Sequence, residues 1–317
     1  MKIIFLGTPE FAVDSLRILV ENGYDVVGVI TAPDKPAGRG QKIVISAVKE
    51  YALQNELNVL QPLKMNDPPF LEEVKKLNAD LQIVVAFRML PEALWSMPTL
   101  GTFNLHGSLL PQYRGAAPIN RAIMNGEKKT GLTTFFLKHE IDTGNIIFRK
   151  EIPIRENESA GELHDRMKVV GAELVLQTVK AIETGCVVEQ SQQSFLDAGE
   201  KIIDAPKIFK EDGKLDFSKS IHELHNQIRG LSPFPGAYFE LKMPNEQVIF
   251  IKILNAIPEP GGTVLTHELV TDGKKFLKIS AADGFINVLE IQIPGKKRMK
   301  PQELLSGFSF PNEAVIL

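Results

Sequence analysis

The fold class is decided by one stretch near the N-terminus, KIIFLGTPEFAVDSLRILVENGYDVVGVIT (residues 2–31). It begins and ends with short apolar runs, KIIFL and DVVGVIT, of the kind found in strands buried on both faces. Between them, FAVDSLRILVE carries apolar residues at helical spacing. Pro9 suits the first turn of that helix, and Gly23 suits its C-terminal cap. The stretch therefore predicts a β-α-β unit.

Three further apolar runs extend this pattern along the chain: LQIVVAF (81–87), GTFNLH (101–106) and LTTFFL (132–137). Helical or loop stretches separate them. Ser159 and Glu162 have the spacing of a capping box, which predicts a helix from there to about Gly185. Buried strands that alternate with helices favour an α/β fold with a doubly wound, mostly parallel sheet.

The pattern changes in the polar segment that follows this helix, which lacks helical periodicity and is typical of a linker. Beyond it, SIHELHNQIRGL (220–231) predicts one helix. Several short β-like runs follow, separated by Pro, Gly, Asn and Asp, and they indicate a small antiparallel barrel of the OB type. We therefore predict a catalytic domain at 1–189, a linker at 190–206 and an OB-like domain at 207–317.

Composition indicates a soluble globular protein, with 44% apolar and 24% charged residues. No apolar run approaches the length of a membrane helix, and the N-terminal run is too short for a signal peptide, so we expect a cytoplasmic protein. The single cysteine, Cys186, argues against disulfides and thiolate metal sites. The net charge of −3 does not favour nucleic-acid binding, so any RNA contact would depend on local basic clusters.

A candidate active site comes from polar residues close to strand ends. Residues i and i+2 of a strand share a face, so Asn104 and His106 lie together, and His106 is followed at once by a turn. An amide beside an imidazole suits a carbonyl that becomes an oxyanion, although two polar residues that merely cap a strand have the same spacing. Asp142 follows the run 132–137, and we expect it at a carboxyl end as well, where it could orient His106 or accept a proton.

Several segments together give the chain a family resemblance that covers nearly its whole length. They are GTPEFA, PDKPAGRGQK, VVAFRMLP, NLHGSLLPQYRGAAPI, IDTG, LHDRM, KIFKEDGKLDF, IRGLSPFPGAY and GKKRM. In these segments the sequence resembles the folate-dependent formyltransferases, and SLLPxYRG after Asn-x-His is specific to users of 10-formyltetrahydrofolate. The resemblance implies a Rossmann-like first domain and transfer of a formyl group from this co-substrate to the α-amine of methionyl initiator tRNA.

The resemblance also implies roles for particular residues. Asn104, His106 and Asp142 match the catalytic residues of the family, which would act by direct attack of the amine through a tetrahedral oxyanion, without a metal. The folate-binding residues it implies are Phe87, Arg88, Met89, Leu90, Ser108, Leu109, Leu110 and Pro111. For tRNA, it implies contacts by Lys35, Arg39 and Lys42 in a Gly- and Pro-rich loop and by Lys207, Lys210, Lys296, Lys297 and Arg298 near the barrel.

Other functions are compatible with parts of this pattern. A glycinamide ribonucleotide formyltransferase would end near the first domain, and the residues beyond 207 argue against it. A formyltetrahydrofolate hydrolase or a nucleotide-sugar formyltransferase could share the catalytic residues, but the basic segments favour tRNA. A non-catalytic RNA-binding protein would not need all three catalytic residues. We expect a monomer without a membrane partner, because no feature requires a second subunit.

Overall fold

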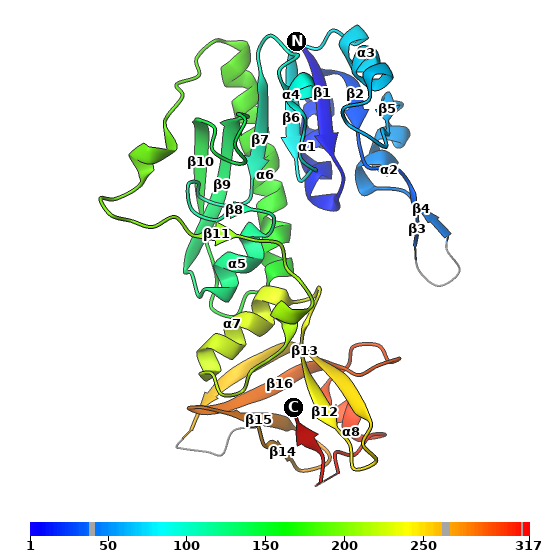
Figure 1. Cartoon of the computed structure of the whole chain (residues 1–317), viewed down its shortest axis with the longest axis vertical. Coiled ribbons are helices and arrows are strands. Elements are labelled where there is room, and N and C mark those ends of the chain that lie inside the picture. The colour runs from blue at the N-terminus through cyan, green and yellow to red at the C-terminus, as the bar shows by residue number, and fades with distance from the viewer. Residues whose placement is uncertain (38–41, 262–266, 312) are drawn as a thin grey trace. The chain divides into compact units, whose positions relative to one another are not determined.

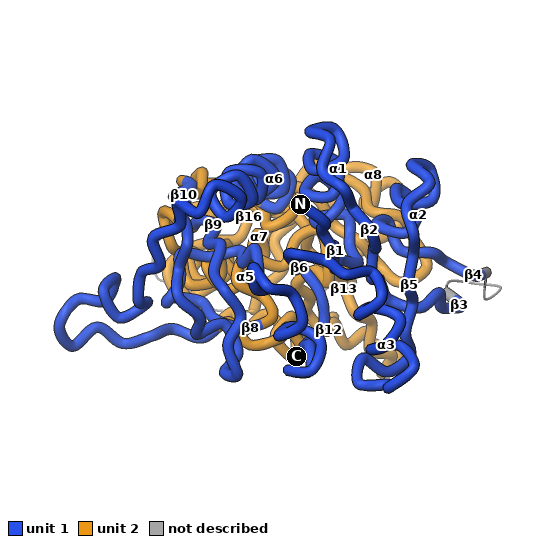
Figure 2. The backbone as a smooth tube through the Cα atoms, turned by 90° about the horizontal axis from the view of Figure 1, so that it is seen from above, with its two compact units in different colours: residues 1–115, 131–152, 164–204 blue, residues 116–130, 153–163, 205–317 orange. Residues whose placement is uncertain are grey.

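The computed structural model describes residues 1–37, 42–261, 267–311 and 313–317. Figure 1 labels its helices and strands. The chain divides into two compact units, coloured separately in Figure 2, and each is described by itself. Unit 1 comprises residues 1–115, 131–152 and 164–204, and unit 2 comprises residues 116–130, 153–163 and 205–317.

Unit 1 contains all or most of the following elements: β1 (Lys2–Gly7), η1 (Glu10–Ala12), α1 (Val13–Glu21), β2 (Asp25–Ile30), β3 (Lys35–Ala37), β4 (Lys42–Val44), α2 (Ala47–Gln54), β5 (Val59–Leu60), α3 (Pro68–Lys76), β6 (Leu81–Val85), α4 (Glu92–Trp95), β7 (Thr102–His106), β8 (Arg114–Gly115), β9 (Lys129–Phe136), β10 (Ile146–Pro153), α6 (Ala160–Glu183) and η2 (Gln192–Phe195).

A seven-stranded sheet in the order β10-β9-β7-β6-β1-β2-β5 forms the centre of unit 1. The strands β5, β2, β1, β6 and β7 are parallel to one another, whereas β9 is antiparallel to β7. Four successive residues of β1, from Ile3 to Leu6, are at most 1% exposed, because helices cover both faces of the sheet. The predicted α/β class with a mostly parallel sheet is confirmed.

The long helix α6 begins with the capping box that the sequence predicts. The Ser159 backbone N–H donates to Glu162 Oε2 at 2.9 Å, and the Glu162 N–H donates to Ser159 Oγ at 3.2 Å. Further along, a Cβ on Gly171 would lie only 2.9 Å from Leu105 Cδ2, so α6 packs tightly against that face of β7. Asn104 and His106 alternate with Leu105 and therefore face away from α6.

Unit 2 contains the remaining elements: α5 (Pro118–Met124), the second residue of β11 (Asp204–Ala205), η3 (Glu211–Gly213), α7 (Ile221–Leu231), β12 (Ala237–Lys242), β13 (Val248–Pro260), β14 (Leu269–Thr271), β15 (Leu277–Ala281), β16 (Gly284–Gln292), α8 (Pro301–Leu305) and β17 (Val315–Ile316).

A six-stranded antiparallel sheet, β14-β15-β16-β13-β12-β17, builds unit 2. The pairing of β13 with β16 shifts register around Asn255, and such bulges let a long strand bend and a sheet curl. The helix α7 buries Leu224 and Ile228 in the same core as Phe239 and Ile253. This curled sheet is consistent with the predicted barrel-like second domain.

Unit 2 also includes α5, which precedes most of the unit in the sequence. The Asn120 side chain donates to the Gly230 carbonyl of α7 at 2.7 Å, and a Cβ on Gly230 would lie 2.6 Å from Met124. The two helices are therefore in close contact. Across the described residues, no helix is long and apolar enough to cross a membrane.

Candidate active site

The side chains of Asn104 and His106 lie on one face of β7, at its carboxyl end, as the alternation of strand residues predicts. His106 is 7% exposed, and Asn104 is half-buried. Within the part of the chain that the structure describes, no hydrogen bond engages the Asn104 side-chain amide. Its two N–H donors therefore remain available to a substrate.

The imidazole of His106 has a different neighbour at each ring nitrogen. Nε2 lies 2.8 Å from the backbone oxygen of Tyr113, and Nδ1 lies 3.8 Å from Asp142 Oδ2. Because a carbonyl oxygen can only accept, the first bond requires a proton on Nε2. In a neutral imidazole Nδ1 then carries the lone pair and faces the carboxylate. The Phe135 ring packs edge-on against the imidazole, with 6.5 Å between ring centroids.

Asp142 reaches His106 by a route that differs from the one expected. Because β9 runs antiparallel to β7, its carboxyl end lies beside the amino end of β7, where the Leu137 N–H donates to Thr102 O at 2.8 Å. Asp142 does follow the carboxyl end of β9, as expected, but this end lies at the opposite edge of the sheet from His106. Instead, the loop after Leu137 returns along β7 and brings the carboxylate to the imidazole.

Two features hold the carboxylate after this return. Asp142 adopts a left-handed backbone conformation with φ of 55°, which Asp tolerates better than most residues. Its Oδ2 accepts a hydrogen bond from the Gly115 N–H at 2.9 Å. The side chains of His106 and Asp142 are 7% and 11% exposed, so their charges interact with little screening by water.

The segment 86–91, for which we predicted folate contacts, follows β6. Ala86 is exposed and has φ of 47°, so the chain turns sharply where the strand ends. The Arg88 guanidinium donates to the carbonyls of Pro62 at 2.6 Å and Leu63 at 3.2 Å, so it anchors a neighbouring loop. Met89 is 74% exposed. Phe87 and Leu90 are partly buried against one core cluster of unit 1.

Hydrogen bonds with Gln112 and Thr133 hold the turn 108–111 in place. The Ser108 hydroxyl donates to the Gln112 carbonyl at 2.6 Å. Thr133 Oγ1 donates to Ser108 O at 2.7 Å and accepts from the Leu110 N–H at 3.1 Å. Ser108 and Leu110 are fully buried, Pro111 is buried, and Leu109 is half-buried. The side chains of Ser108 and Leu110 thus shape the turn that follows His106.

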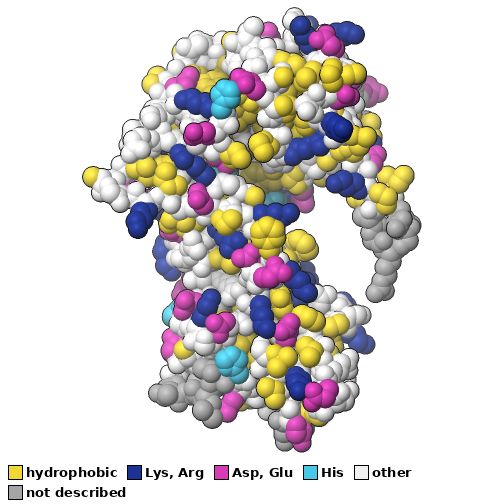
Figure 3. Space-filling view, in the orientation of Figure 1, with side chains coloured by type: hydrophobic (Ala, Val, Ile, Leu, Met, Phe, Trp, Pro, Cys, Tyr) yellow, Lys and Arg dark blue, Asp and Glu magenta, His cyan; other side chains and the backbone are white. Residues whose placement is uncertain are grey.

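The residues predicted to contact tRNA fall in both units. In unit 1, Lys35 is exposed at the start of β3 and Lys42 begins β4, while Arg39 lies outside the described residues. Both signs of charge are interspersed over the face shown in Figure 3, so a basic surface has to be sought locally.

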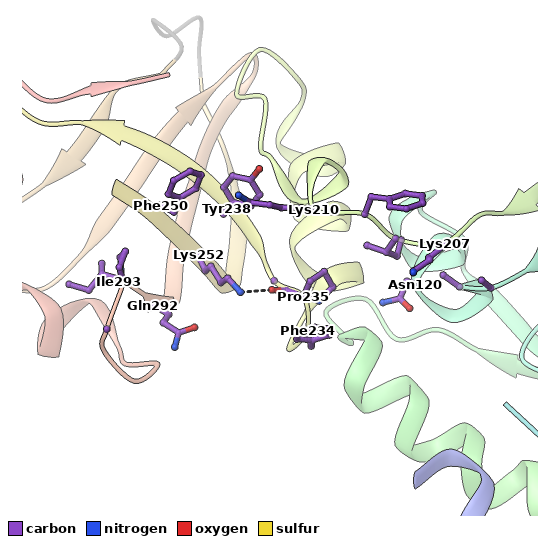
Figure 4. Close-up of a pocket in the computed structure, with 17 residues that line it drawn as sticks. Asn120, Lys207, Lys210, Phe234, Pro235, Tyr238, Phe250, Lys252, Gln292 and Ile293 are labelled. Carbon is purple, nitrogen blue, oxygen red and sulfur yellow. Dashed lines mark hydrogen bonds between the residues drawn. The ribbon is translucent and has the colours of Figure 1, made fainter. Parts of the chain in front are cut away.

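Unit 2 has such a local surface, a groove with a cavity volume of about 850 Å³ (Figure 4). Its lining includes Lys207 and Lys210, and Lys210 Nζ lies 4.7 Å from the centroid of the Phe250 ring. Phe250 is 40% exposed and Phe234 is 82% exposed. Pro294 and Gly295 line the same groove and lead directly into the exposed side chains of Lys296, Lys297 and Arg298. The two predicted basic segments are thus neighbours in space.

Comparison with known proteins matches both parts of the chain. Residues 1–179 match the model of the formyl transferase family, and residues 207–309 match the formyl transferase C-terminal domain. The chain is 55% identical to the methionyl-tRNA formyltransferase of Flavobacterium johnsoniae over 317 residues, covering 100% of this chain and 99% of that protein. The chain belongs to the methionyl-tRNA formyltransferase family. The resemblance recognised in the sequence is confirmed, and the protein is a formyl transferase.

One further relative of this formyl transferase and one solved structure extend the comparison. The methionyl-tRNA formyltransferase of Bacteroides fragilis is 53% identical over 309 residues, covering 97% of this chain and 95% of that protein. A solved N-formyltransferase from Helicobacter canadensis, in complex with folinic acid and dTDP-3-aminofucose, aligns with a TM-score of 0.65 and 24% identity, covering 91% of this chain and 98% of that chain. The latter likeness concerns the fold alone.

One buried contact of the candidate site was missed at the level of sequence. Gln192, 5% exposed, donates from Nε2 to the carbonyls of Asp142 at 2.7 Å and Gly144 at 2.9 Å. It lies in the segment predicted to be a linker, where polar residues without periodicity gave no signal. Gln192 also binds Arg114, which donates to Gln192 Oε1 from Nη2 at 2.6 Å and from Nε at 3.1 Å.

Proposed function

We propose that the enzyme transfers the formyl group of 10-formyltetrahydrofolate to the α-amine of methionyl initiator tRNA. The acceptor is supported by the names of relatives that are 53% and 55% identical over nearly the whole chain. The chemistry is carried by one observation, the unengaged Asn104 amide on the same strand face as the buried His106–Asp142 pair. The folate is a substrate, because it brings the formyl group and leaves without it.

In the proposed reaction the neutral amine attacks the formyl carbon, and the formyl oxygen becomes an oxyanion. Asn104 donates hydrogen bonds to this oxygen, and a donor of this kind typically contributes roughly a hundred- to a thousandfold in rate. The His106 donor at Nε2 is held by Tyr113 O, so His106 acts through Nδ1.

His106 Nδ1 takes the proton that the attacking nitrogen loses, and the resulting imidazolium is stabilised by the Asp142 carboxylate 3.8 Å away. The same proton then passes to N10 of the folate as the carbon–nitrogen bond breaks. Atoms and charges balance, because one proton leaves the amine and one is gained by the leaving nitrogen. Asp142 is not required to change its charge.

We propose that the folate lies along residues 87–90 and 108–111. Met89 and Leu109 retain accessible apolar surface, and the fully buried Ser108 and Leu110 fix the shape of the turn beside it. A flat aromatic ring suits such an apolar surface of fixed shape. The exposed left-handed turn at Ala86 is compatible with close approach of a ligand to the backbone.

We propose that the groove of unit 2 binds the tRNA. Lysines beside accessible aromatic rings are the combination that attracts phosphates and stacks on unpaired bases. Lys207, Lys210, Phe234 and Phe250 supply both kinds of group. Lys35, Arg39 and Lys42 are proposed as a second contact, and we keep 1–189, 190–206 and 207–317 as the functional domains of a monomer.

The test of this function compares acceptors. Purified enzyme is incubated with 10-formyltetrahydrofolate and with methionyl initiator tRNA, free methionine or a nucleotide-linked amino sugar, and the formylated product is measured. We expect rapid transfer to the charged tRNA only. Transfer to the amino sugar without transfer to the tRNA would refute the proposed acceptor.

A variant then tests the proposed chemistry. His106→Ala should nearly abolish transfer and leave tRNA affinity within about twofold, because the side chain is buried in unit 1 and is not among the residues that line the groove. His222→Ala, which removes an exposed imidazole from α7, is the matched control and should retain full activity. A large loss of tRNA binding in His106→Ala would contradict its catalytic role.

A further inference from the structure

The side-chain amide of Gln192 is buried, and both of its polar atoms make hydrogen bonds. Its Nε2 group makes two hydrogen bonds, to the carbonyls of Asp142 and Gly144, at 2.7 and 2.9 Å. Its Oε1 accepts two, from Nη2 and Nε of Arg114, at 2.6 and 3.1 Å. An amide side chain has two N–H donors and two acceptor lone pairs, so its capacity is filled. Such saturation fixes the orientation of the amide.

Two hydrogen bonds lie within the loop that this amide holds, from Lys138 Nζ to Asn145 Oδ1 and from Thr143 Oγ1 to Glu140 O, both at 3.0 Å, and neither involves Asp142. Residues 138–141 are exposed, and Ile141 is 61% exposed despite being apolar. At the end of the loop Gly144 is pressed against the Phe136 carbonyl, where no Cβ would fit. Between these regions lies Asp142, whose left-handed conformation has to be maintained by its surroundings.

Asp142 is therefore held at both its backbone and its side chain, and both attachments lead to β8. Its backbone oxygen accepts a hydrogen bond from Gln192, whose side-chain oxygen accepts one from Arg114. Its carboxylate accepts a hydrogen bond from the N–H of Gly115, which follows Arg114 in the chain. Two adjacent residues thus define where the carboxylate lies relative to His106.

We propose that Gln192 is a positioning residue, which acts through Asp142, and that Arg114 fixes the orientation of the Gln192 amide. This inference rests on the proposed function, because it assigns Gln192 to the formyl transfer reaction. Loss of the amide should leave Asp142 present but displaced from the imidazole. A misplacement of about 1 Å at a reacting group can cost roughly a hundredfold in rate.

The test uses Gln192→Met, which preserves side-chain length without polar atoms, and Gln192→Glu, which retains the acceptor for Arg114 but loses the donors. We expect kcat for transfer to methionyl-tRNA to fall about 10- to 100-fold in both, with KM for folate and tRNA within about threefold. Gln193→Ala, a change of the exposed neighbour, is the matched control and should have the kcat of the wild type.

A double variant separates positioning from a merely structural role. If Gln192 acts through Asp142, then Gln192→Met should cost little more in an Asp142→Asn background, since the carboxylate is already absent. An equal loss of kcat in both backgrounds, or wild-type kcat in Gln192→Met, would overturn the proposal. If Gln192→Met does not fold, Gln192→Glu and Arg114→Lys provide the same comparison. Failure of the wild-type enzyme to formylate methionyl-tRNA would instead refute the proposed function.

Discussion

Replacement of Asp142 by Asn isolates the charge of the carboxylate. The two side chains have nearly the same shape, and the Asn oxygen can still accept from the Gly115 N–H, which lies 2.9 Å from Oδ2 in the present structure. What is lost is the attraction between the carboxylate and an imidazolium at His106. The substitution therefore tests whether charge, rather than loop shape, supports the reaction.

The magnitude follows from the separation of 3.8 Å between Asp142 Oδ2 and His106 Nδ1. With an effective dielectric constant of about 20, unit charges at this distance attract by about 4 kcal/mol. Each 1.4 kcal/mol, roughly, corresponds to a factor of ten in rate, so the upper limit of the loss is about a thousandfold. Because the pair is almost completely buried, moderate salt should not reproduce the effect.

The assay is single-turnover formylation of methionyl-tRNA at saturating formyl donor, which reports the chemical step. The matched control is Asp165→Asn, since Asp165 lies 3.2 Å from His164 in an ion pair whose carboxylate is 66% exposed. We expect the control to retain the wild-type rate. A rate for Asp142→Asn within about threefold of the wild type would refute the proposed stabilisation of the imidazolium.

The remaining predictions concern stability, loop geometry and the RNA groove. Burial, and then the neighbouring Arg229, lower the pKa of His225 from 6.5 to about 4, so the unfolded chain binds this proton more tightly and stability falls as the pH drops from 6.5 to 4. The loss should reach about 3 kcal/mol; urea unfolding should show this slope in the wild type and not in His225→Gln. Gly144→Ala should lower kcat at least tenfold at unchanged tRNA affinity, because its Cβ would collide with Phe136 O. A wild-type kcat in Gly144→Ala would contradict a role for the geometry of this loop. Lys210→Ala should weaken tRNA binding and reduce the salt slope by about 0.7 to 0.9. Lys274→Ala, the exposed control outside the groove, should do neither.

The elements that the sequence predicts well are those whose burial gives a recognisable pattern of apolar residues. The strands β1, β2 and β6 are covered on both faces, so nearly every residue is apolar. The capping box before α6 is local chemistry and is equally visible. The shared face of Asn104 and His106 follows from the two-residue repeat of a strand alone.

What the sequence does not predict depends on the direction and path of the chain. Nothing in the residues of β9 says that it runs antiparallel to β7, because apolar strands of either direction look alike. The return of the loop to His106 could therefore not be foreseen. Gln192 has its partners 48 to 78 positions away, and a polar residue in a polar segment gives no sign that it is buried. Similarly, α5 gives no sign that it packs on α7.

The length of the loop after Leu137 limits where Asp142 can lie. From Thr102 to His106 the strand extends about 13 Å, and the five steps from Leu137 to Asp142 can span at most about 17 Å. The chain therefore has little slack with which to bring a carboxylate to the imidazole. The side chains of Glu140 and Ile141 point to solvent and should be freely exchangeable in engineered variants. Removal of a single residue from this loop should be far more damaging than any of those exchanges. The length of the loop, and not its composition, determines whether the Asp142 carboxylate reaches the imidazole.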